Sequence, residues 1–560
     1  MRMNEWWRKS VVYQIYPKSF NDTIGNGVGD LKGIIEKLDY LNDLGVDVLW
    51  LTPVYASPQK DNGYDISDYY SIHEEYGTMD DFERLLEETH KRGMKLIMDL
   101  VVNHTSIEHN WFKESRKAID NQYRDFYIWK DPVNGEEPTN WQSKFGGNAW
   151  KYDEETGQYY LHLFDVTQAD LNWENETLRK HVYDMMHFWF DKGIDGFRLD
   201  VINLISKDQS FLNDDGSVAP GDGRKFYTDG TRVHEFLQEM NHEVLSKYDS
   251  MTVGEMSSTS IEHCIKYSNP ERNELSMTFN FHHLKVDYPN GEKWALADFD
   301  FLALKKILTK WQVEMNKGGG WNALFWCNHD QPRVVTRYGN DTTYHKESAK
   351  MLATTIHLMQ GTPYIYQGEE FGMTDPGFEG IDDYRDVETL NYYQIMKAKG
   401  IPEENIMEII KRKSRDNSRT PVQWNDQENA GFTTGTPWIP VARNYKEINA
   451  EKAVADQSSI FYHYKKLIQL RKEYNIFTVG DYQLLLDEDP QLFVYERTNG
   501  TEKALVINNF YGNDAVFTLP GEWVDDKANS ELVLSNYQDS ISLEKTMRLR
   551  PYESLIYYVR

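Results

Sequence analysis

Four short apolar runs of this sequence end in side chains that can carry charge. These side chains are Asp99 at the first run, Arg198 and Asp200 at the second, Glu255 at the third, and His329 and Asp330 at the fourth. Any one of them alone fits a helix cap or one half of a salt bridge. A charged group beside an apolar strand destabilises a fold unless it is paired, so four such strand ends together favour a site that performs chemistry.

Two carboxyl groups and a third acid suit the hydrolysis of a glycosidic bond. A retaining mechanism needs a carboxylate nucleophile and a protonated carboxylic acid about 5–5.5 Å apart. Neighbouring strands could hold Asp200 and Glu255 at that separation. We expect Arg198 to keep Asp200 ionised, and we expect the less paired Glu255 to have a raised pKa and to donate a proton. Asp330 would stabilise the positive charge of the transition state.

The elements that must position these residues follow a repeated pattern. Eight apolar, β-like runs are found at Val11–Ile15, Val46–Leu51, Leu96–Val102, Gly196–Leu199, Met251–Val253, Ser276–Phe281, Asn322–Trp326 and Pro363–Tyr366. Amphipathic helical patterns lie between them, at Asp30–Asn42, Asp80–Lys91, Asn175–Asp191, Thr231–Leu245, Phe301–Val313 and Glu347–Met359. Strands that alternate with helices predict a parallel sheet, and eight such units predict a closed (β/α)₈ barrel.

Two long excursions interrupt the alternation of strands and helices, and near residue 479 the sequence pattern changes. Residues 103–174 follow the third strand and are polar, aromatic and rich in glycine, and residues 371–435 follow the eighth strand. Loops of this length are usually functional, and these two would lie on the carboxyl face of the barrel. We expect a barrel from residues 1–102 and 175–478. Alternating runs separated by turns predict an antiparallel β-sandwich over residues 479–560.

Composition excludes several classes of protein. The 61 lysines and arginines against 89 aspartates and glutamates give a net charge of −28, which argues against nucleic acid and anionic membranes as partners. No run reaches the roughly 18 apolar residues of a membrane span, and the start lacks a secretory signal. The two cysteines, Cys264 and Cys327, match no metal spacing and suit a reducing cytosol. We therefore expect a cytoplasmic enzyme with a small-molecule substrate.

At these residues the chain resembles the α-amylase family, glycoside hydrolase family 13. Residues 99–104, 196–202, 254–255 and 328–330 resemble its four signature regions, and residues 168–173 resemble the further signature of its oligo-1,6-glucosidase branch. The resemblance implies that Asp200 is the nucleophile, Glu255 the acid/base and Asp330 the transition-state stabiliser. It also implies that residues 103–174 are the family's domain B. Residues implied around the non-reducing glucose are Asp65, Tyr64, His104, Phe145, Arg198, His329 and Arg415.

Two features of the resemblance concern linkage and metal. Val201 follows the nucleophile, and valine there accompanies α-1,6 and related bonds in this branch. Many relatives bind Ca²⁺ in the loop after the first strand, where this chain keeps Asp22, Asn26 and Asp30 but carries Ile24 in place of an oxygen ligand. Since calcium takes six to eight oxygens, we expect no cofactor, or at most a weak structural Ca²⁺ site.

One local reversal of charge points to the substrate. Oligo-1,6-glucosidases typically show Phe-Glu-His-Met-Asp after the sixth strand, where this chain reads Phe281-His282-His283-Leu284-Lys285. Two acids thus become His282 and Lys285 in a strongly acidic protein, which indicates capture of a phosphate on the leaving sugar. With residues 254–258 and 325–327, the segment resembles family members that cleave trehalose 6-phosphate, a phosphorylated disaccharide, into glucose and glucose 6-phosphate.

Other hypotheses stay open. The same chemistry on neutral isomalto-oligosaccharides would make the chain an oligo-1,6-glucosidase or a dextran glucosidase. A sucrose-isomerising relative would use the same pocket and exclude water. An inactive amylase-fold partner of membrane transporters would show a lost carboxylate and a membrane anchor. Drift on a solvated loop would also account for the changes at residues 282 and 285.

Overall fold

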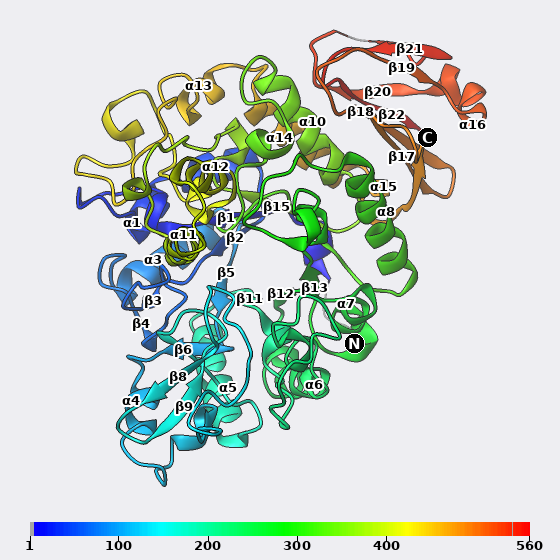
Figure 1. The fold of residues 1–560 in the computed structure, drawn as a ribbon. Helices are drawn as coiled ribbons and strands as arrows, with labels where there is room; N and C mark the ends of the chain where they lie inside the picture. The colour runs from blue at the N-terminus through cyan, green and yellow to red at the C-terminus, as the bar shows by residue number, and fades with distance from the viewer. Residues whose placement is uncertain (1–4, 540) are drawn as a thin grey trace.

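Eight parallel strands form the central sheet of the computed structural model, which describes residues 5–539 and 541–560. Their order is β13-β12-β11-β5-β2-β1-β15-β14, and a parallel bridge from Thr278 to Asn322 joins the two edge strands. The sheet therefore closes into the predicted barrel (Figure 1). The strands are β1 (Val12–Ile15), β2 (Val48–Leu51), β5 (Lys95–Leu100), β11 (Gly196–Leu199), β12 (Met251–Glu255), β13 (Met277–Phe279), β14 (Ala323–Leu324) and β15 (Thr362–Tyr366).

The barrel interior explains why these runs are apolar throughout. The rings of Trp50, Phe279 and Tyr364 meet inside the barrel, with the Phe279 and Tyr364 centroids 4.6 Å apart. Strands covered on both faces need side chains that avoid water on both sides, so they read as continuous apolar runs. The first residue of β11, Gly196, has to be a glycine, because a Cβ at that position would lie 1.9 Å from the carbonyl oxygen of Met251.

Helices surround the barrel at the six predicted amphipathic patterns, and further helices that were not predicted form at Ile261–Ser268 and Ile460–Glu473. The pattern at residues 30–42 forms two helices instead of one, because the chain leaves helical geometry at Lys37. Within residues 5–539 and 541–560, no helix combines the length and the apolar character needed to cross a membrane. The surrounding helices are α1 (Leu31–Glu36), α2 (Leu38–Leu44), α3 (Met79–Lys91), α5 (Glu176–Asp191), α6 (Val233–Glu243), α7 (Ile261–Ser268), α8 (Phe301–Lys317), α9 (Val334–Tyr338), α10 (His345–His357), α14 (Ile460–Glu473) and α15 (Ile476–Val479).

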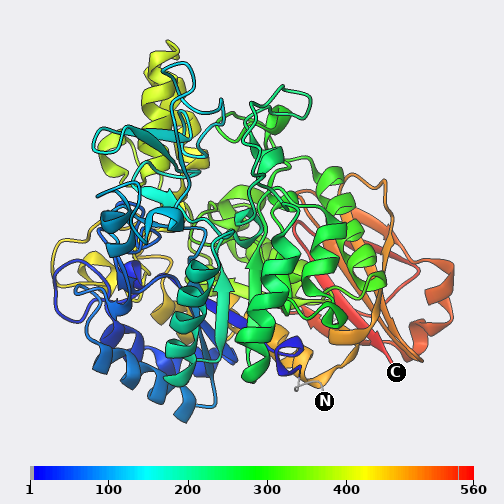
Figure 2. The same ribbon diagram turned by 90° about the horizontal axis from the view of Figure 1, so that it is seen from below.

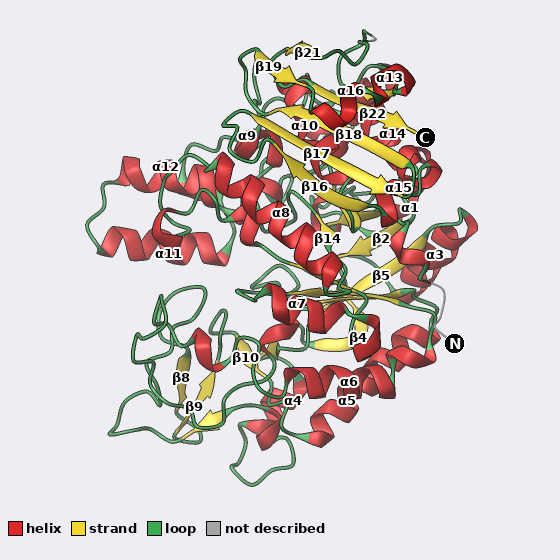
Figure 3. Ribbon diagram, turned by 90° about the vertical axis from the view of Figure 1, so that its right-hand side faces the viewer, coloured by secondary structure: helices red, strands yellow, loops and turns green. Residues whose placement is uncertain are grey.

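The two long excursions project from the same face of the barrel (Figures 2 and 3). The side-chain amide of Asn391 donates to the carbonyl of Phe145 at 3.2 Å, so the excursions touch above the strand ends. The sequence patterns missed α11. The first excursion holds β6 (His104–Ser106), α4 (Asn110–Ser115), β7 (Trp129–Lys130), β8 (Trp150–Asp153), β9 (Gln158–Leu161) and β10 (Gln168–Asp170). The second holds α11 (Val387–Ala398) and α12 (Glu403–Lys413), and α13 (Ala450–Ala455) follows it.

A third excursion, residues 206–232 between β11 and α6, packs against the first. It contains little regular structure except the 3-10 turn Arg224–Phe226. The Trp141 ring lies between Phe211 and Phe226, with centroid distances of 5.7 and 5.5 Å. The indole N–H of Trp141 also donates to the carbonyl of Leu212. Residues 206–232 thus pack against the first excursion, an arrangement that the sequence patterns did not reveal.

The carboxyl-terminal residues form antiparallel sheets, as predicted. The larger sheet has the order β16-β17-β18-β22-β20, and β19 pairs with β21 in a second sheet. Side chains from both sheets, including Val494, Phe517 and Leu549, share one buried cluster. The strands are β16 (Asp481–Leu485), β17 (Leu492–Asn499), β18 (Glu502–Asn509), β19 (Ala515–Thr518), β20 (Glu531–Ser535), β21 (Thr546–Leu549) and β22 (Ser554–Val559), with the short helix α16 (Gly521–Val524); outside these sheets, β3 (Tyr55–Ala56) pairs with β4 (Asp68–Ile72).

Candidate active site

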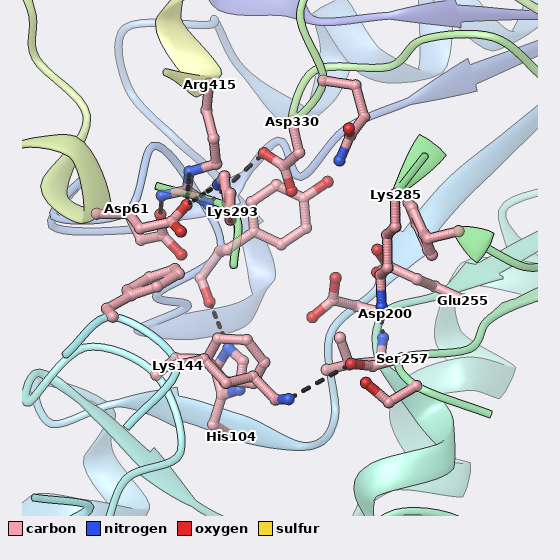
Figure 4. A pocket seen from close by; sticks show the side chains of 18 of the residues that line it. Asp61, His104, Lys144, Asp200, Glu255, Ser257, Lys285, Lys293, Asp330 and Arg415 are labelled. Atoms are coloured by element: carbon pink, nitrogen blue, oxygen red, sulfur yellow. Dashed lines mark hydrogen bonds and ion pairs between the residues drawn. The ribbon is translucent and has the colours of Figure 1, made fainter. Parts of the chain in front are cut away.

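The ends of four barrel strands deliver charged side chains to one place. Asp99 lies in β5, Asp200 directly follows β11, Glu255 ends β12, and Asp330 follows β14. Asp200, Glu255 and Asp330 line a single pocket (Figure 4). The parallel arrangement of the strands forces this convergence, because the carboxyl ends of all eight meet at the same face of the barrel.

Arg198 joins the acids of the pocket. Its Nη1 donates to Asp99 Oδ1 at 2.7 Å and to Asp200 Oδ1 at 2.8 Å, and its Nη2 donates to Glu255 Oε2. Asp200 and Glu255 therefore sit on two nitrogens of one guanidinium. The expectation that Glu255 is less paired is wrong, since Arg198 and the Val201 N–H both contact its Oε2. Glu255 also lines the pocket.

Sharing one guanidinium couples the protonation of the two carboxyl groups. Burial raises the pKa of Asp200 well above its usual range, with added charge repulsion from Glu255 and Asp99, and Arg198 only partly opposes this. Arg198 thus favours the ionised form of Asp200 in the expected direction, but burial and the neighbouring acids oppose it. Two carboxyl groups so close to each other disfavour double ionisation. One ionised and one protonated carboxyl is the state that begins a retaining displacement.

Asp330 is held ionised by its neighbours. Burial alone would raise its pKa, but His329, Arg415 and Arg419 lower it well below the usual range. Arg419 Nη2 donates to Asp330 Oδ1 at 2.5 Å. Burial lowers the pKa of His329 to about 3, so its ring is neutral and the two arginines carry the effect. Gln14 donates to His329 Nδ1 at 2.7 Å, which leaves the ring proton on Nε2, on the side of Asp330.

The acid that meets Arg415 is Asp61, not Asp65. Arg415 Nη2 donates to Asp61 Oδ1 at 2.9 Å, and both residues line the pocket. The carboxylate of Asp65 accepts from the backbone N–H groups of Lys60 and Asp61 and from the hydroxyl of Ser57. Asp65 is fully buried, and its hydrogen bonds hold the loop that presents Asp61. The expectation that Asp65 contacts the sugar is therefore wrong.

The other residues implied around the glucose do gather near this end of the pocket. Tyr64 donates to Asp99 Oδ2 at 3.0 Å and stacks on the ring of His329, with centroids 5.1 Å apart. His104 Nε2 lies 3.1 Å from the carbonyl oxygen of Tyr64. The ring of Phe145 lies 4.6 Å from the guanidinium carbon of Arg415. Such flat and polar surfaces suit one sugar ring.

Lys285 and His282 separate in the structure. Lys285 lines the pocket with Phe281, and the surrounding protein, together with Arg224, lowers its pKa to about 8. Because the side chain reaches solvent, we take its ammonium as charged at neutral pH. The ring of His282 packs instead on Trp311 of α8, 5.2 Å between centroids, and does not line the pocket. Binding of substrate by His282 therefore stays a prediction that the position of its ring does not support.

Comparison with known proteins identifies the family to which this architecture belongs. A family model described as the α-amylase catalytic domain matches residues 14–480, and a model of the α-amylase SusG C-terminal domain matches residues 492–556. The chain belongs to the α-amylase family. Trehalose-6-phosphate hydrolase of Bacillus subtilis is 69% identical to this family member, with 99% of this chain and 98% of the relative covered. Oligo-1,6-glucosidase of Parageobacillus thermoglucosidasius is 56% identical, with 99% of each chain covered.

Solved structures agree with this family membership. The crystal structure of a mutant trehalose-6-phosphate hydrolase of Bacillus licheniformis, in complex with PNG, superposes with a TM-score of 0.96. It is 69% identical and covers 100% of both chains. An isomaltulose synthase of Erwinia rhapontici, 42% identical, superposes with a TM-score of 0.94 over 99% of both chains. The fold is thus shared by proteins that are named for different activities.

The loop in which α-amylase relatives bind Ca²⁺ does not fit the metal in this member. Asp22 Oδ1 accepts from the N–H groups of Ile24 and Gly25, and Asp22 Oδ2 accepts from Gly27. Asn26 accepts from the Val28 N–H, and Asp30 accepts from Thr23 and Gly33. These oxygens stabilise the loop itself. In the described part of the chain, no group of three His, Cys, Asp or Glu side chains has the geometry of a metal site.

Sequence reasoning missed several residues of the pocket. Asp61 stands four residues before Asp65 in one short loop, and only their directions distinguish them. Lys144 comes from the first excursion, and Glu388 and Gln331 complete the pocket wall. Local sequence holds no signal for any of them, because long-range packing of separate loops brings them to the site.

Proposed function

We propose that this chain hydrolyses trehalose 6-phosphate to glucose and glucose 6-phosphate with retention of configuration. Asp200 attacks the anomeric carbon of the glucose, and the bond from that carbon to the bridging oxygen breaks. Glu255 gives its proton to the bridging oxygen, so that glucose 6-phosphate leaves. Glu255 then removes a proton from water, whose oxygen attacks the same carbon and releases Asp200. The expected product of the two inversions is α-glucose.

The other residues of the pocket hold the sugar for this step. Arg415 and Asp61 form a fixed ion pair at the glucose end, where both can bind hydroxyl groups. Asp330, kept ionised by Arg415 and Arg419, places a negative charge beside the cation-like transition state. Fixed charges of this kind act before the reaction starts and need no reorganisation during it.

Lys285 is the observation that carries the phosphorylated substrate. It lines the same pocket as Glu255, and none of the residues described forms an ion pair with it. Lys293, the neighbouring lysine of the pocket, is already paired with Glu388 at 2.6 Å. A free ammonium in a protein of net charge −28 favours an anionic leaving sugar. The trehalose-6-phosphate hydrolase of Bacillus subtilis, which is 69% identical to this chain, supports this choice.

Action on neutral isomalto-oligosaccharides is the second candidate. Val201 after the nucleophile and the 56% identical oligo-1,6-glucosidase favour it. Purified enzyme distinguishes the two through kcat/KM for trehalose 6-phosphate, trehalose and isomaltose. We expect a strong preference for the phosphorylated sugar. Equal or faster hydrolysis of isomaltose would refute the proposed substrate.

We also propose that residues 103–174 and residues 479–560 form domains of their own beside the barrel.

We propose further that the chain works in the cytoplasm. Phosphorylated sugars do not diffuse across membranes, because the charged group is too costly to dehydrate. An enzyme that consumes one therefore belongs in the compartment in which it is made. Fractionation of cells that express the chain tests this location.

A further inference from the structure

Four segments from different parts of the chain meet around Ser257 and Ser258, which line the pocket together with Glu255. Lys144 comes from the first excursion and donates to the hydroxyl of Ser257 at 3.4 Å. Arg224 comes from residues 206–232, and its Nη1 donates to the hydroxyl of Ser258 at 3.4 Å. The serines follow β12, and Lys285 follows β13. Figure 4 shows Lys144 and Lys285 reaching toward Ser257 from opposite walls.

The charges at this place do not balance. Asp222 pairs with Arg224 through Nε at 2.9 Å and Nη2 at 2.6 Å. Among the described residues, neither Lys144 nor Lys285 has such a partner. Arg224 is close enough to lower the pKa of both lysines, after the larger effect of burial. Three cations and one carboxylate leave two net positive charges, which an anion would stabilise.

The serine pair is held in a fixed geometry. Asn203 Oδ1 accepts from the backbone N–H of Ser257 at 2.9 Å, and Asn203 Nδ2 donates to the Ser257 carbonyl at 2.8 Å. Ser258 adopts a φ of 53°, in the left-handed region that non-glycine residues rarely enter. Strain of this kind persists where surrounding contacts enforce it, and it is common at ligand sites. The loop therefore presents both hydroxyls before a ligand arrives.

We propose that Lys144, Arg224, Ser257, Ser258 and Lys285 together bind the phosphate dianion on the leaving sugar. This set is called the phosphate subsite below. The inference rests on the proposed function and extends it from one lysine to a built site. Its position follows from Glu255, which protonates the leaving oxygen and stands two residues before Ser257. The two net charges match a phosphomonoester that carries close to two negative charges at neutral pH.

Arg224→Gln and Lys144→Gln test the phosphate subsite. We compare kcat/KM for trehalose 6-phosphate with kcat/KM for 4-nitrophenyl α-glucoside, which lacks the phosphate. The ratio of the two should fall by roughly 10- to 100-fold in each variant, mainly through KM for the phosphorylated sugar. Arg224→Lys keeps the charge and should recover part of the loss. Inhibition by glucose 6-phosphate should weaken in parallel.

Lys225→Gln is the matched control, since Lys225 neighbours Arg224 but pairs with Asp214 and Asp215, away from the pocket. This change should leave the ratio within about twofold of the starting enzyme, since no phosphate contact is lost. A wild-type enzyme that prefers isomaltose refutes the proposed function. A wild-type enzyme that prefers trehalose 6-phosphate, with the ratio unchanged in Arg224→Gln and Lys144→Gln, refutes the phosphate subsite and leaves the function standing. Equal losses on both substrates would refute the subsite as well, because they would show that these residues only support the fold.

Discussion

Glu255→Gln tests the division of labour between the two acids. Arg198 and the Val201 N–H both donate to Oε2 of Glu255, so we expect Oε1 to be the oxygen that meets the leaving group. Glutamine keeps the shape and can still accept from Arg198, but it cannot donate an acidic proton. Loss of general acid catalysis lowers rates by about 10²- to 10⁴-fold, and we expect kcat for trehalose 6-phosphate to fall within that range.

The leaving group decides how much of this loss is seen. Nitrophenolate departs without a proton, so cleavage of 4-nitrophenyl α-glucoside should suffer at least about tenfold less than cleavage of the sugar substrate. Breakdown of the glucosyl-enzyme then lacks its base, and a burst of nitrophenol should precede a slow steady state. Azide needs no base and should restore the steady rate by forming a glucosyl azide.

Stopped-flow absorbance follows the burst, and thermal unfolding shows whether the variant is folded. Glu262→Gln, an exposed position on α7, is the control and should behave as the starting enzyme. Equal losses on the sugar and aryl substrates, with neither burst nor azide rescue, would show that Glu255 does not transfer the proton.

Four further substitutions have distinct expected outcomes. Lys285→Asp replaces a charge-assisted contact with repulsion and should lower kcat/KM for trehalose 6-phosphate by at least roughly 10- to 150-fold relative to an aryl glucoside; equal losses on both substrates would make Lys285 structural. Asp61→Asn should lower kcat/KM for every glucoside substrate with little change in Tm. Asp65→Asn should chiefly lower the free energy of unfolding, by about 1–3 kcal/mol, because it disturbs a buried acceptor of three hydrogen bonds. Chemical denaturation and steady-state kinetics separate the two variants, and the reverse pattern would show that Asp65 contacts the sugar. Gly196→Ala should destabilise the barrel by about 2 kcal/mol or more, because its Cβ would lie 1.9 Å from the Met251 carbonyl oxygen; a normal Tm would contradict the close approach of β11 to β12.

The barrel could be predicted because its signal is local. A strand covered on both faces must be apolar along its length, so runs such as residues 46–51 and 96–102 can be recognised without any knowledge of their partners. Two of the differences from the predicted helices have local reasons as well. Lys37 breaks the helix predicted at residues 30–42, and α11 was missed because its apolar residues do not form one stripe at helical spacing.

The strand-end acids could also be predicted, because topology does most of the positioning. Asp200 and Glu255 each end a parallel strand, and neighbouring parallel strands bring their carboxyl ends together. Their number and order along the chain were therefore enough to indicate paired-acid chemistry. The electrostatics of the two acids could not be predicted, because they depend on the single guanidinium of Arg198, which contacts both.

What the sequence by itself determined was thus the barrel, the acids at its strand ends and the local change of charge at Lys285. Only the tertiary structure decided which aspartate of the loop before β4 meets Arg415, that His282 turns toward Trp311, and that Arg224 arrives beside Ser258. The physical reason is range. Burial and strand periodicity are written in neighbouring residues, whereas the direction of a loop side chain depends on packing between segments far apart in the chain.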